Sequence, residues 1–483
     1  MANVDVAAEI EAIKSIIGKY FPIYDVRLTH DSLSIFITPD PRTLDQNFES
    51  LRRELGARGY IPFLHHQGGE YIIAIARKPE IKRRGTWINQ LLLIVTFFST
   101  TFAGAYLWAS YKGVSSVLTV DNFLWGAVFF AIPLMTMLGM HELCHYLASK
   151  KHGVEASLPY FIPSVPPLGT FGAFISMREP MPDRKALVDI GVAGPIGGLI
   201  VAIPLVIIGL YLTAHGEVQS GELGTGGAIA IVVQPLYQFF MLFVPVPEGV
   251  ALHPTAFAAW VGLLVTAINL LPAGQLDGGH IARGLLGDKS RYLSYATIAL
   301  LFIMSFFYIG WLFFALLIFL LGLRHPAPLN DISKVDNKRK AIGAAALVIL
   351  LLTFVPIPVV EIPPDHSYEI VLIEPQSSSV NVTPGQNVVF YMVVNNTGNT
   401  YLHLNFVMKQ VPQNWSAIIY LSNQSRENAT NALEFEIPYK RSANVTVEIT
   451  VPENAEEGLR TIVLDTSSQS ESRTINFQIT VNG

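Results

Sequence analysis

The feature that most restricts the fold is a series of long, almost uncharged runs between residues 86 and 362. They cover 87–109, 123–148, 186–212, 253–273, 291–323 and 341–360. A helix needs about 20 apolar residues to cross a bilayer, so each run is long enough for one crossing. The run 291–323 is longer, and we expect it to form a hairpin of two short helices. The sequence therefore predicts a mainly α-helical polytopic membrane protein with about seven transmembrane helices.

Composition agrees with this class and excludes others. Hydrophobic residues make up 51% of the chain and charged residues only 14%. The net charge of −5 is spread along the chain, so the sequence gives no sign of a nucleic-acid partner. The single cysteine, Cys144, excludes an intrachain disulfide framework. The stretch 229–249 is apolar but interrupted by prolines, which favours a re-entrant or interfacial segment over a crossing.

Two flanking regions have different patterns. Residues 1–85 alternate between helical and strand periodicity in the order αββαββ, which predicts a small α+β accessory domain. Residues 366–483 alternate with period two between turn-rich breaks, which predicts a β-sandwich. The transmembrane domain then occupies residues 86–362. Every N-x-S/T sequon lies in the last region, at Asn381, Asn395, Asn414, Asn423, Asn428 and Asn444.

Basic residues predict the orientation in the membrane. A cluster at 77–84 precedes the first apolar run, and Lys338, Arg339 and Lys340 precede the last. Basic flanks usually stay in the cytoplasm, so we expect a cytoplasmic N-terminus. An odd number of crossings then places the sandwich outside the cell, which agrees with its sequons. We expect a multi-pass protein of the cell membrane with an extracellular C-terminal domain.

The motif HELCH, residues 141–145, lies inside one of the apolar runs. On a helix, His141 and His145 are one turn apart on the same face, so both imidazoles can bind one metal ion. Glu142 is adjacent and can activate a water molecule as a general base without being a ligand. Ionisable groups at membrane depth are expensive, which argues against coincidence. Histidines satisfied only by interhelical hydrogen bonds are the structural alternative.

A catalytic zinc site normally has three protein ligands. The candidate for the third is Asp277, at the end of the 253–273 run and at a depth similar to that of the two histidines in the predicted topology. Gly278 and Gly279 next to it allow backbone to approach closely. Pro272 and Gly274 break the helix before it, and such irregular backbone is tolerated only against protein or a water-filled cavity.

These residues resemble the site-2 protease family of intramembrane zinc metalloproteases. Its two signatures, H-E-x-x-H and N-x-x-P-x-x-x-L-D-G, read here as HELCH and, over 269–278, NLLPAGQLDG. The stretches 168–177 and 189–198 also look like family sequence, and the resemblance covers about 120–325. With the soluble N-terminal region, it is similar to the archaeal and plastid branch. The last region looks like an Ig-like, CARDB-type module.

The resemblance implies one zinc ion per chain, with His141, His145 and Asp277 as ligands. Glu142 would activate water, and Asn269 would help to hold the substrate backbone. The expected activity is hydrolysis of peptide bonds within transmembrane segments of membrane proteins, as in regulated intramembrane proteolysis. The alternative is a membrane zinc transporter or metal sensor without hydrolytic activity. A transport site, however, gains nothing from a glutamate beside two ligands.

Several nearby residues have a structural interpretation. Cys144 is expected to be a small filler, because a fourth ligand would close the position that catalysis needs. His152 and His280 are expected to be solvated near the membrane boundary, and the alternative for His280 is a contact that supports a metal ligand. The glycines of 193–198 are expected to allow close helix packing. The stretch 168–177 is either a strand that pairs with substrate or an ordinary loop.

Overall fold

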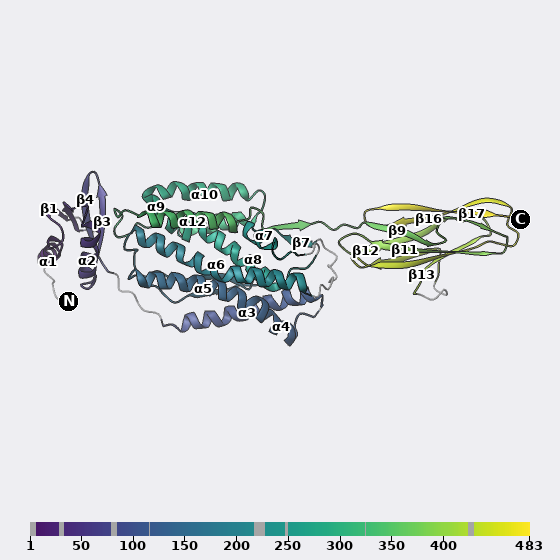
Figure 1. Cartoon of the computed structure of the whole chain (residues 1–483), viewed down its shortest axis with the longest axis horizontal. Coiled ribbons are helices and arrows are strands. Elements are labelled where there is room, and N and C mark those ends of the chain that lie inside the picture. The colour runs from purple at the N-terminus through teal and green to yellow at the C-terminus, as the bar shows by residue number, and fades with distance from the viewer. Residues whose placement is uncertain are drawn as a thin grey trace. The chain divides into compact units, whose positions relative to one another are not determined.

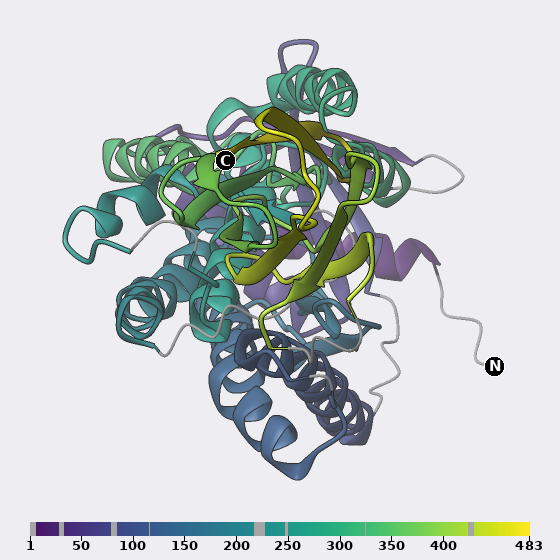
Figure 2. The same cartoon turned by 90° about the vertical axis from the view of Figure 1, so that its right-hand side faces the viewer.

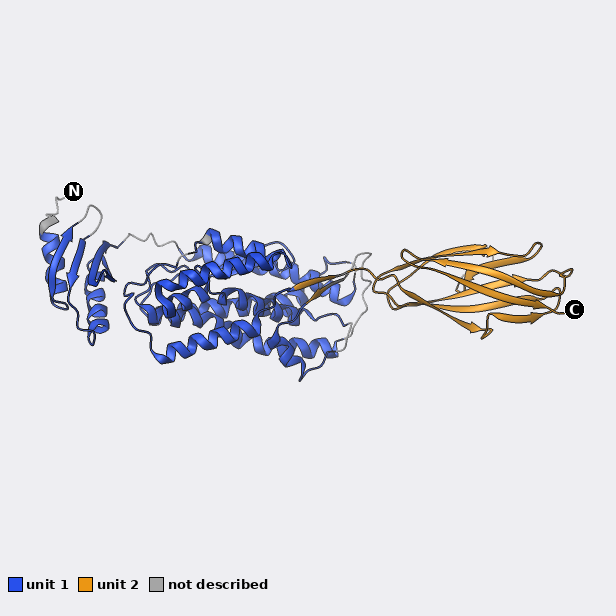
Figure 3. Ribbon diagram, turned by 90° about the horizontal axis from the view of Figure 1, so that it is seen from above, with its two compact units in different colours: residues 1–218, 232–358 blue, residues 219–231, 359–483 orange. Residues whose placement is uncertain are grey.

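The computed structural model describes residues 6–28, 33–78, 85–114, 116–216, 228–246, 250–323, 325–423 and 429–483. They form two compact units, one of residues 1–218 and 232–358 and one of residues 219–231 and 359–483 (Figure 3). The first unit holds both the predicted accessory domain and the helical region. The second holds the predicted sandwich. The division into three domains therefore stays a prediction, and the sequon at Asn428 lies outside the described residues.

The N-terminal region has the predicted order of elements. These are α1 (Val6–Gly18), β1 (Ile23–Leu28), β2 (Leu33–Ile37), α2 (Leu44–Gly56), β3 (Tyr60–Gln67) and β4 (Glu70–Arg77). The strands pair antiparallel in the order β1-β2-β4-β3. Apolar residues of both helices meet the buried sheet face in one core that includes Ile17, Leu51 and Ile73.

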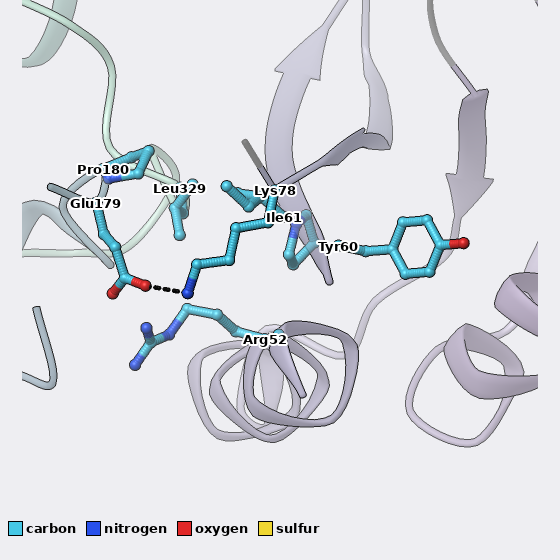
Figure 4. A pocket seen from close by; sticks show the side chains of 9 residues that line it. Arg52, Tyr60, Ile61, Lys78, Glu179, Pro180 and Leu329 are labelled. Carbon is cyan, nitrogen blue, oxygen red and sulfur yellow. Dashed lines mark hydrogen bonds and ion pairs between the residues drawn. The ribbon is translucent and has the colours of Figure 1, made fainter. Parts of the chain in front are cut away.

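The free edge of β3 is covered by a segment distant in sequence, between α11 (Gly310–Leu321) and α12 (Asn337–Thr353). The main-chain N–H of Leu64 donates to the carbonyl of Leu329 at 2.7 Å. Leu329 in turn donates to the carbonyl of Met181 at 2.8 Å, and its side chain lies in the N-terminal core. Lys78 pairs with Glu179 beside a small pocket that Arg52 also lines (Figure 4). The N-terminal region is therefore bound to the helical region by backbone, apolar and ionic contacts.

The helical region contains the remaining helices of the first unit (Figure 1). They are α3 (Trp87–Lys112), α4 (Val120–Gly126), the π-helical turn η1 (Ala127–Ala131), α5 (Ile132–Lys151), α6 (Arg184–His215), α7 (Pro235–Met241), α8 (Pro254–Leu270), α9 (Asp277–Leu286), the 3₁₀ turn η2 (Gly287–Lys289), α10 (Ser290–Met304), α11 and α12. Each predicted apolar run contains at least one helix, and the run 291–323 forms two helices as expected, whereas the end of the run 341–360 lies in the strand β8.

Among the described residues, three helical segments are long and apolar enough to cross a membrane. They are Trp87–Lys112, Val120–Lys151 and Arg184–His215. Pro254–Leu270 and Gly310–Leu320 are apolar but shorter. The structure thus supports membrane helices, whereas the total of seven crossings stays a prediction. The stretch 229–249 contains the strand β7 (Ala228–Ile231) and the short α7, and no long helix in its described part.

A small hairpin lies between α5 and α6. Strand β5 (Tyr160–Pro163) pairs antiparallel with β6 (Thr170–Phe174). Of the two alternatives for 168–177, the structure therefore has the strand. The loop of the hairpin contacts α3, since the Ser99 hydroxyl donates to the carbonyl of Gly169 at 2.6 Å.

The second unit contains two sheets that enclose one apolar core (Figures 1 and 2). One has the order β10-β17-β16-β12-β14 and the other β13-β15-β11-β9. Their strands are β9 (Tyr368–Glu374), β10 (Ser379–Val382), β11 (Asn387–Asn396), β12 (Leu402–Gln410), β13 (Ser416–Leu421), β14 (Ala432–Ile437), β15 (Ser442–Thr450), β16 (Gly458–Ser467) and β17 (Ser472–Val481). The alternation of the sequence predicted this two-layer arrangement. Before it, β8 (Val359–Ile362) pairs antiparallel with β7.

Candidate metal centre

Helix α5 carries three of the predicted site residues. His141, Glu142 and His145 are each only 5–6% exposed. Pro133, near the start of α5, cannot donate a backbone hydrogen bond to the carbonyl of Phe129. That carbonyl instead accepts from the Thr255 hydroxyl of α8 at 2.9 Å. Pro133 thus leaves a carbonyl free before α5, and the hydrogen bond to this carbonyl connects α5 to α8, the helix that precedes Asp277.

A sharp turn brings Asp277 to the histidines. Helix α8 ends at Leu270, and Gly274 has a φ of +52° in the turn that follows. Asp277 is the first residue of α9. A Cβ at Gly278 would lie 2.1 Å from the Leu270 carbonyl oxygen, so only glycine lets the two helix ends approach this closely. The predicted role of Gly278 in close backbone approach agrees with this geometry.

The three predicted ligands converge. The Nε2 atoms of His141 and His145 lie 3.1 Å apart. Asp277 Oδ2 is 3.1 Å from the first and 3.2 Å from the second. Ligand atoms around tetrahedral zinc, each about 2.0–2.2 Å from the ion, are separated by roughly 3.3–3.6 Å. The spacing is therefore close to what one zinc ion requires, and these three form the group of possible metal ligands found among the described residues.

The donor set also fits a cation. His145 Nδ1 lies 2.8 Å from the main-chain carbonyl of Ile190, and in a neutral ring this nitrogen is then the N–H donor. Nε2 of His145 is left as an acceptor that faces the carboxylate of Asp277 and Nε2 of His141. A divalent cation satisfies all three acceptors at once, whereas a single proton satisfies only two of them.

Helix α6 lies close against the ligands because its facing surface consists of glycines. Gly198 lies beside His141, where a Cβ would be 3.3 Å from Nδ1. A Cβ at Gly197 would lie 2.4 Å from Cys144 Sγ. Cys144 thus packs against α6, which agrees with its interpretation as a small filler. The glycines serve helix packing as expected.

One further predicted site residue, Asn269, and one residue of the stretch 168–177, Ile175, lie at the site. Asn269 Nδ2 is 3.4 Å from His141 Nε2, so its amide borders the ligand set. The backbone N–H of Ile175, one residue after the end of β6, faces the Glu142 carboxylate. The hairpin therefore ends beside the predicted general base.

His152 and His280 differ from the expectation that they are solvated. Both are half-buried. His152 Nε2 lies 3.0 Å from an Asp189 oxygen, and His280 Nδ1 lies 3.0 Å from the Leu276 carbonyl. The contacts of Ile190 and Asp189 were not predicted, because a backbone carbonyl leaves no pattern in a sequence and the partner of a single carboxylate is set by tertiary packing.

The comparisons with known proteins agree with this site. Residues 129–310 match the model of Peptidase family M50. The chain is 31% identical over 248 residues to the probable zinc metalloprotease EGY1, chloroplastic, of Arabidopsis thaliana. This match covers 47% of this chain and 43% of that protein. Over 235 residues it is 33% identical to EGY2, a protein of the same description from the same plant, with 47% and 41% covered.

A third Arabidopsis relative, the probable zinc metallopeptidase EGY3, is 28% identical over 298 residues, covering 56% of this chain and 49% of that protein. The chain thus spans less than half the length of these relatives. Family M50 and the names of the relatives support the resemblance to site-2 proteases for the segment that carries the metal centre.

Proposed function

We propose that this chain is an intramembrane zinc endopeptidase that hydrolyses peptide bonds in transmembrane segments of membrane proteins. The observation that carries the proposal is the convergence of three acceptor side chains next to a buried glutamate. His141, His145 and Asp277 would hold the ion, and three protein ligands are the number that a catalytic zinc site normally has. The match to Peptidase family M50 supports the same chemistry. A transporter would need the ligands but not the glutamate.

The roles follow from position. A zinc ion held by His141, His145 and Asp277 would act as a Lewis acid, which polarises a carbonyl and makes water more acidic. Glu142 takes the proton from the attacking water and returns it to the leaving amine. Asn269, beside His141, is placed to hydrogen-bond a peptide group of the substrate. The low exposure of the site excludes bulk water and strengthens these interactions.

The substrate must be extended before it can be cut, because a helix hides its peptide bonds in its own hydrogen bonds. Strand β6 forms one edge of a two-stranded sheet, and the residue after it contacts Glu142. We propose that the substrate adds to this sheet as an extended strand, which would carry its scissile bond toward the metal centre.

The proposed topology has seven crossings, with the N-terminus in the cytoplasm and residues 366–483, an Ig-like module, outside the cell membrane. Basic flanks and sequons support it. Cysteine labelling tests it: Ser377→Cys on a Cys144→Ala background should react with a membrane-impermeant thiol reagent in intact cells. Reaction only after lysis would reverse the orientation.

The activity is tested by co-expression with candidate single-span membrane proteins. Glu142→Gln should keep zinc and lose all detectable cleavage, because it removes only the base. His141→Ala should lose both zinc and cleavage. If Glu142→Gln instead cleaves as the wild type does, Glu142 is not the base. If it moves zinc across vesicles as the wild type does and neither form cleaves, the transporter alternative holds.

A further inference from the structure

A group of charged side chains from three helices includes the residue of α6 that precedes Ile190, the contact of His145. Asp189 of α6 accepts a hydrogen bond from His152, at the end of α5, at 3.0 Å. It also accepts two from Arg339 of α12, at 2.9 Å from Nε and 2.5 Å from Nη2. Such a two-point pair fixes both partners in direction as well as in distance.

The position of this group on α6 gives it a link to a metal ligand. Ile190, the next residue after Asp189, offers the carbonyl that binds His145 Nδ1 at 2.8 Å. His152 follows His145 by seven residues, or about two helical turns, so both lie on the face of α5 that meets α6. Two adjacent residues of α6 therefore contact α5. Ile190 contacts the predicted ligand His145, and Asp189 contacts His152.

We propose that Asp189 is a positioning residue for His145, and that Arg339 of α12 holds it in that role. Asp189 sets the height and rotation of the first turns of α6, and thereby the place of the Ile190 carbonyl that fixes the His145 ring. The metal centre is then complete only when α12 is in place. This inference rests on the proposed function.

Loss of one partner of the Asp189–Arg339 pair is expected to be costly, because both charged side chains are largely buried. The side chains of Asp189 and Arg339 are only 24% and 22% exposed. Removal of the guanidinium leaves a half-buried carboxylate with His152 as its remaining partner in this group. The helix would then shift or the carboxylate would turn toward water. Because the glycine surface of α6 leaves His145 little room, a small shift of α6 moves the ring.

Metal binding by the purified full chain tests the proposal. Partners that orient a ligating histidine typically contribute 10–100-fold to metal affinity. Arg339→Gln and Asp189→Asn should therefore weaken zinc binding, measured by competition with a chelator, by about 10-fold or more. They should also change the visible spectrum of the cobalt-substituted protein, which reports the ligand geometry. Arg339→Lys keeps the charge but not the two-point contact and should fall between wild type and Arg339→Gln.

The matched control is Lys185→Gln. Lys185 lies on the same first turns of α6 and forms an ion pair with Asp45 of the N-terminal region, in which the two side chains are 28% and 44% exposed. A general loss of helix contacts would affect both variants alike. The proposal requires that Lys185→Gln keep the zinc affinity and cobalt spectrum of the wild type.

Two results would overturn the inference. One is an unchanged cobalt spectrum and zinc affinity in Arg339→Gln and Asp189→Asn. The other is the same change in Lys185→Gln. In either case the proposed function still holds if the wild-type protein binds zinc and cleaves substrate. If the wild-type protein binds no zinc, the proposed function and the inference about Asp189 are both wrong. Zinc binding by the wild type is therefore measured before any variant is compared.

Discussion

Gly194 of α6 lies so close to His145 of α5 that a Cβ atom added to Gly194 would stand 2.0 Å from the Nε2 of His145. That nitrogen is the one that faces His141 and Asp277. No pair of carbon and nitrogen atoms that are not bonded can come this close. The place of the imidazole therefore depends on the absence of a side chain on the neighbouring helix.

We expect Gly194→Ala to abolish zinc binding while the helices still form, because alanine favours a helix more than glycine does. The added methyl group must displace the His145 ring from the ligand set. Metal analysis of the purified variant measures this. Gly139→Ala on α5 is the control, since its Cβ would meet Phe161 at an ordinary 3.6 Å, and it should keep its zinc. Wild-type zinc content in Gly194→Ala would show that the site can rearrange.

Asp277→Ala should also lose zinc, because two histidines alone leave the ion without its charged ligand. Asp277→Asn keeps the shape and removes the negative charge, so it should retain less zinc than the wild type. Zinc content and cleavage should fall together in both variants. Full retention of zinc and activity in Asp277→Ala would remove Asp277 from the site and leave the third ligand to be sought elsewhere.

Removal of residues 366–483 should leave zinc and chemistry intact, since no residue of the metal centre comes from this region. The truncated protein also keeps strands β7 and β8, which pair with each other, because β8 ends at Ile362. We propose that this module excludes substrates with bulky external domains, so the shortened protein should cut a wider range of them. Loss of cleavage for substrates with short external segments, with zinc retained, would indicate that the module grips substrate instead.

A pH dependence is expected in the N-terminal region. The Tyr60 hydroxyl and the Arg77 guanidinium hold the pKa of Glu9 below its ordinary value of 4.5. The ionised form is thus favoured in the folded state, and this stabilisation is present above about pH 4.5 and is lost as the pH falls through the lowered pKa. Hydrogen exchange of residues 60–77 should show faster opening in that range, after correction for intrinsic rates.

Glu9→Gln should remove this pH dependence and make the region less stable at neutral pH. Glu11→Gln, at an exposed position on the same helix, is the control and should behave as the wild type does. Equal behaviour of the two variants would show that the contacts of Glu9 contribute nothing measurable.

The helices and the two histidines were predictable because their signals are local. An apolar run of sufficient length specifies a helix, and two histidines four residues apart specify a shared face. Asp277 was also found, although it lies 136 residues from His141, because a second motif marks it. The approach of Asp277 to the histidines depends on Gly278, and the position of Gly278 directly after Asp277 indicated this role.

The contacts that orient the site were not predictable. Asp189 and Arg339 are 150 residues apart, and each by itself looks like a solvated charge at a helix end. The carbonyl of Ile190 has no side-chain signature at all. The contact at the edge of β3 was likewise not predictable, because nothing in the loop before α12 marks Leu329 as a neighbour of Leu64. Only tertiary packing creates these pairs.

The position of Leu329 has a consequence for the order in which the protein is made. The N-terminal sheet leaves the ribosome early. At that time Leu329, which packs into the core of the sheet and hydrogen-bonds to β3, has not yet been added. Roughly 250 more residues must be polymerised first, which takes about 12–50 s at typical rates of synthesis. During that interval β3 presents an open strand edge, the kind of surface through which nascent chains associate wrongly. The N-terminal region therefore reaches its final stability only after the segment that contains Leu329, which follows α11, has been synthesised.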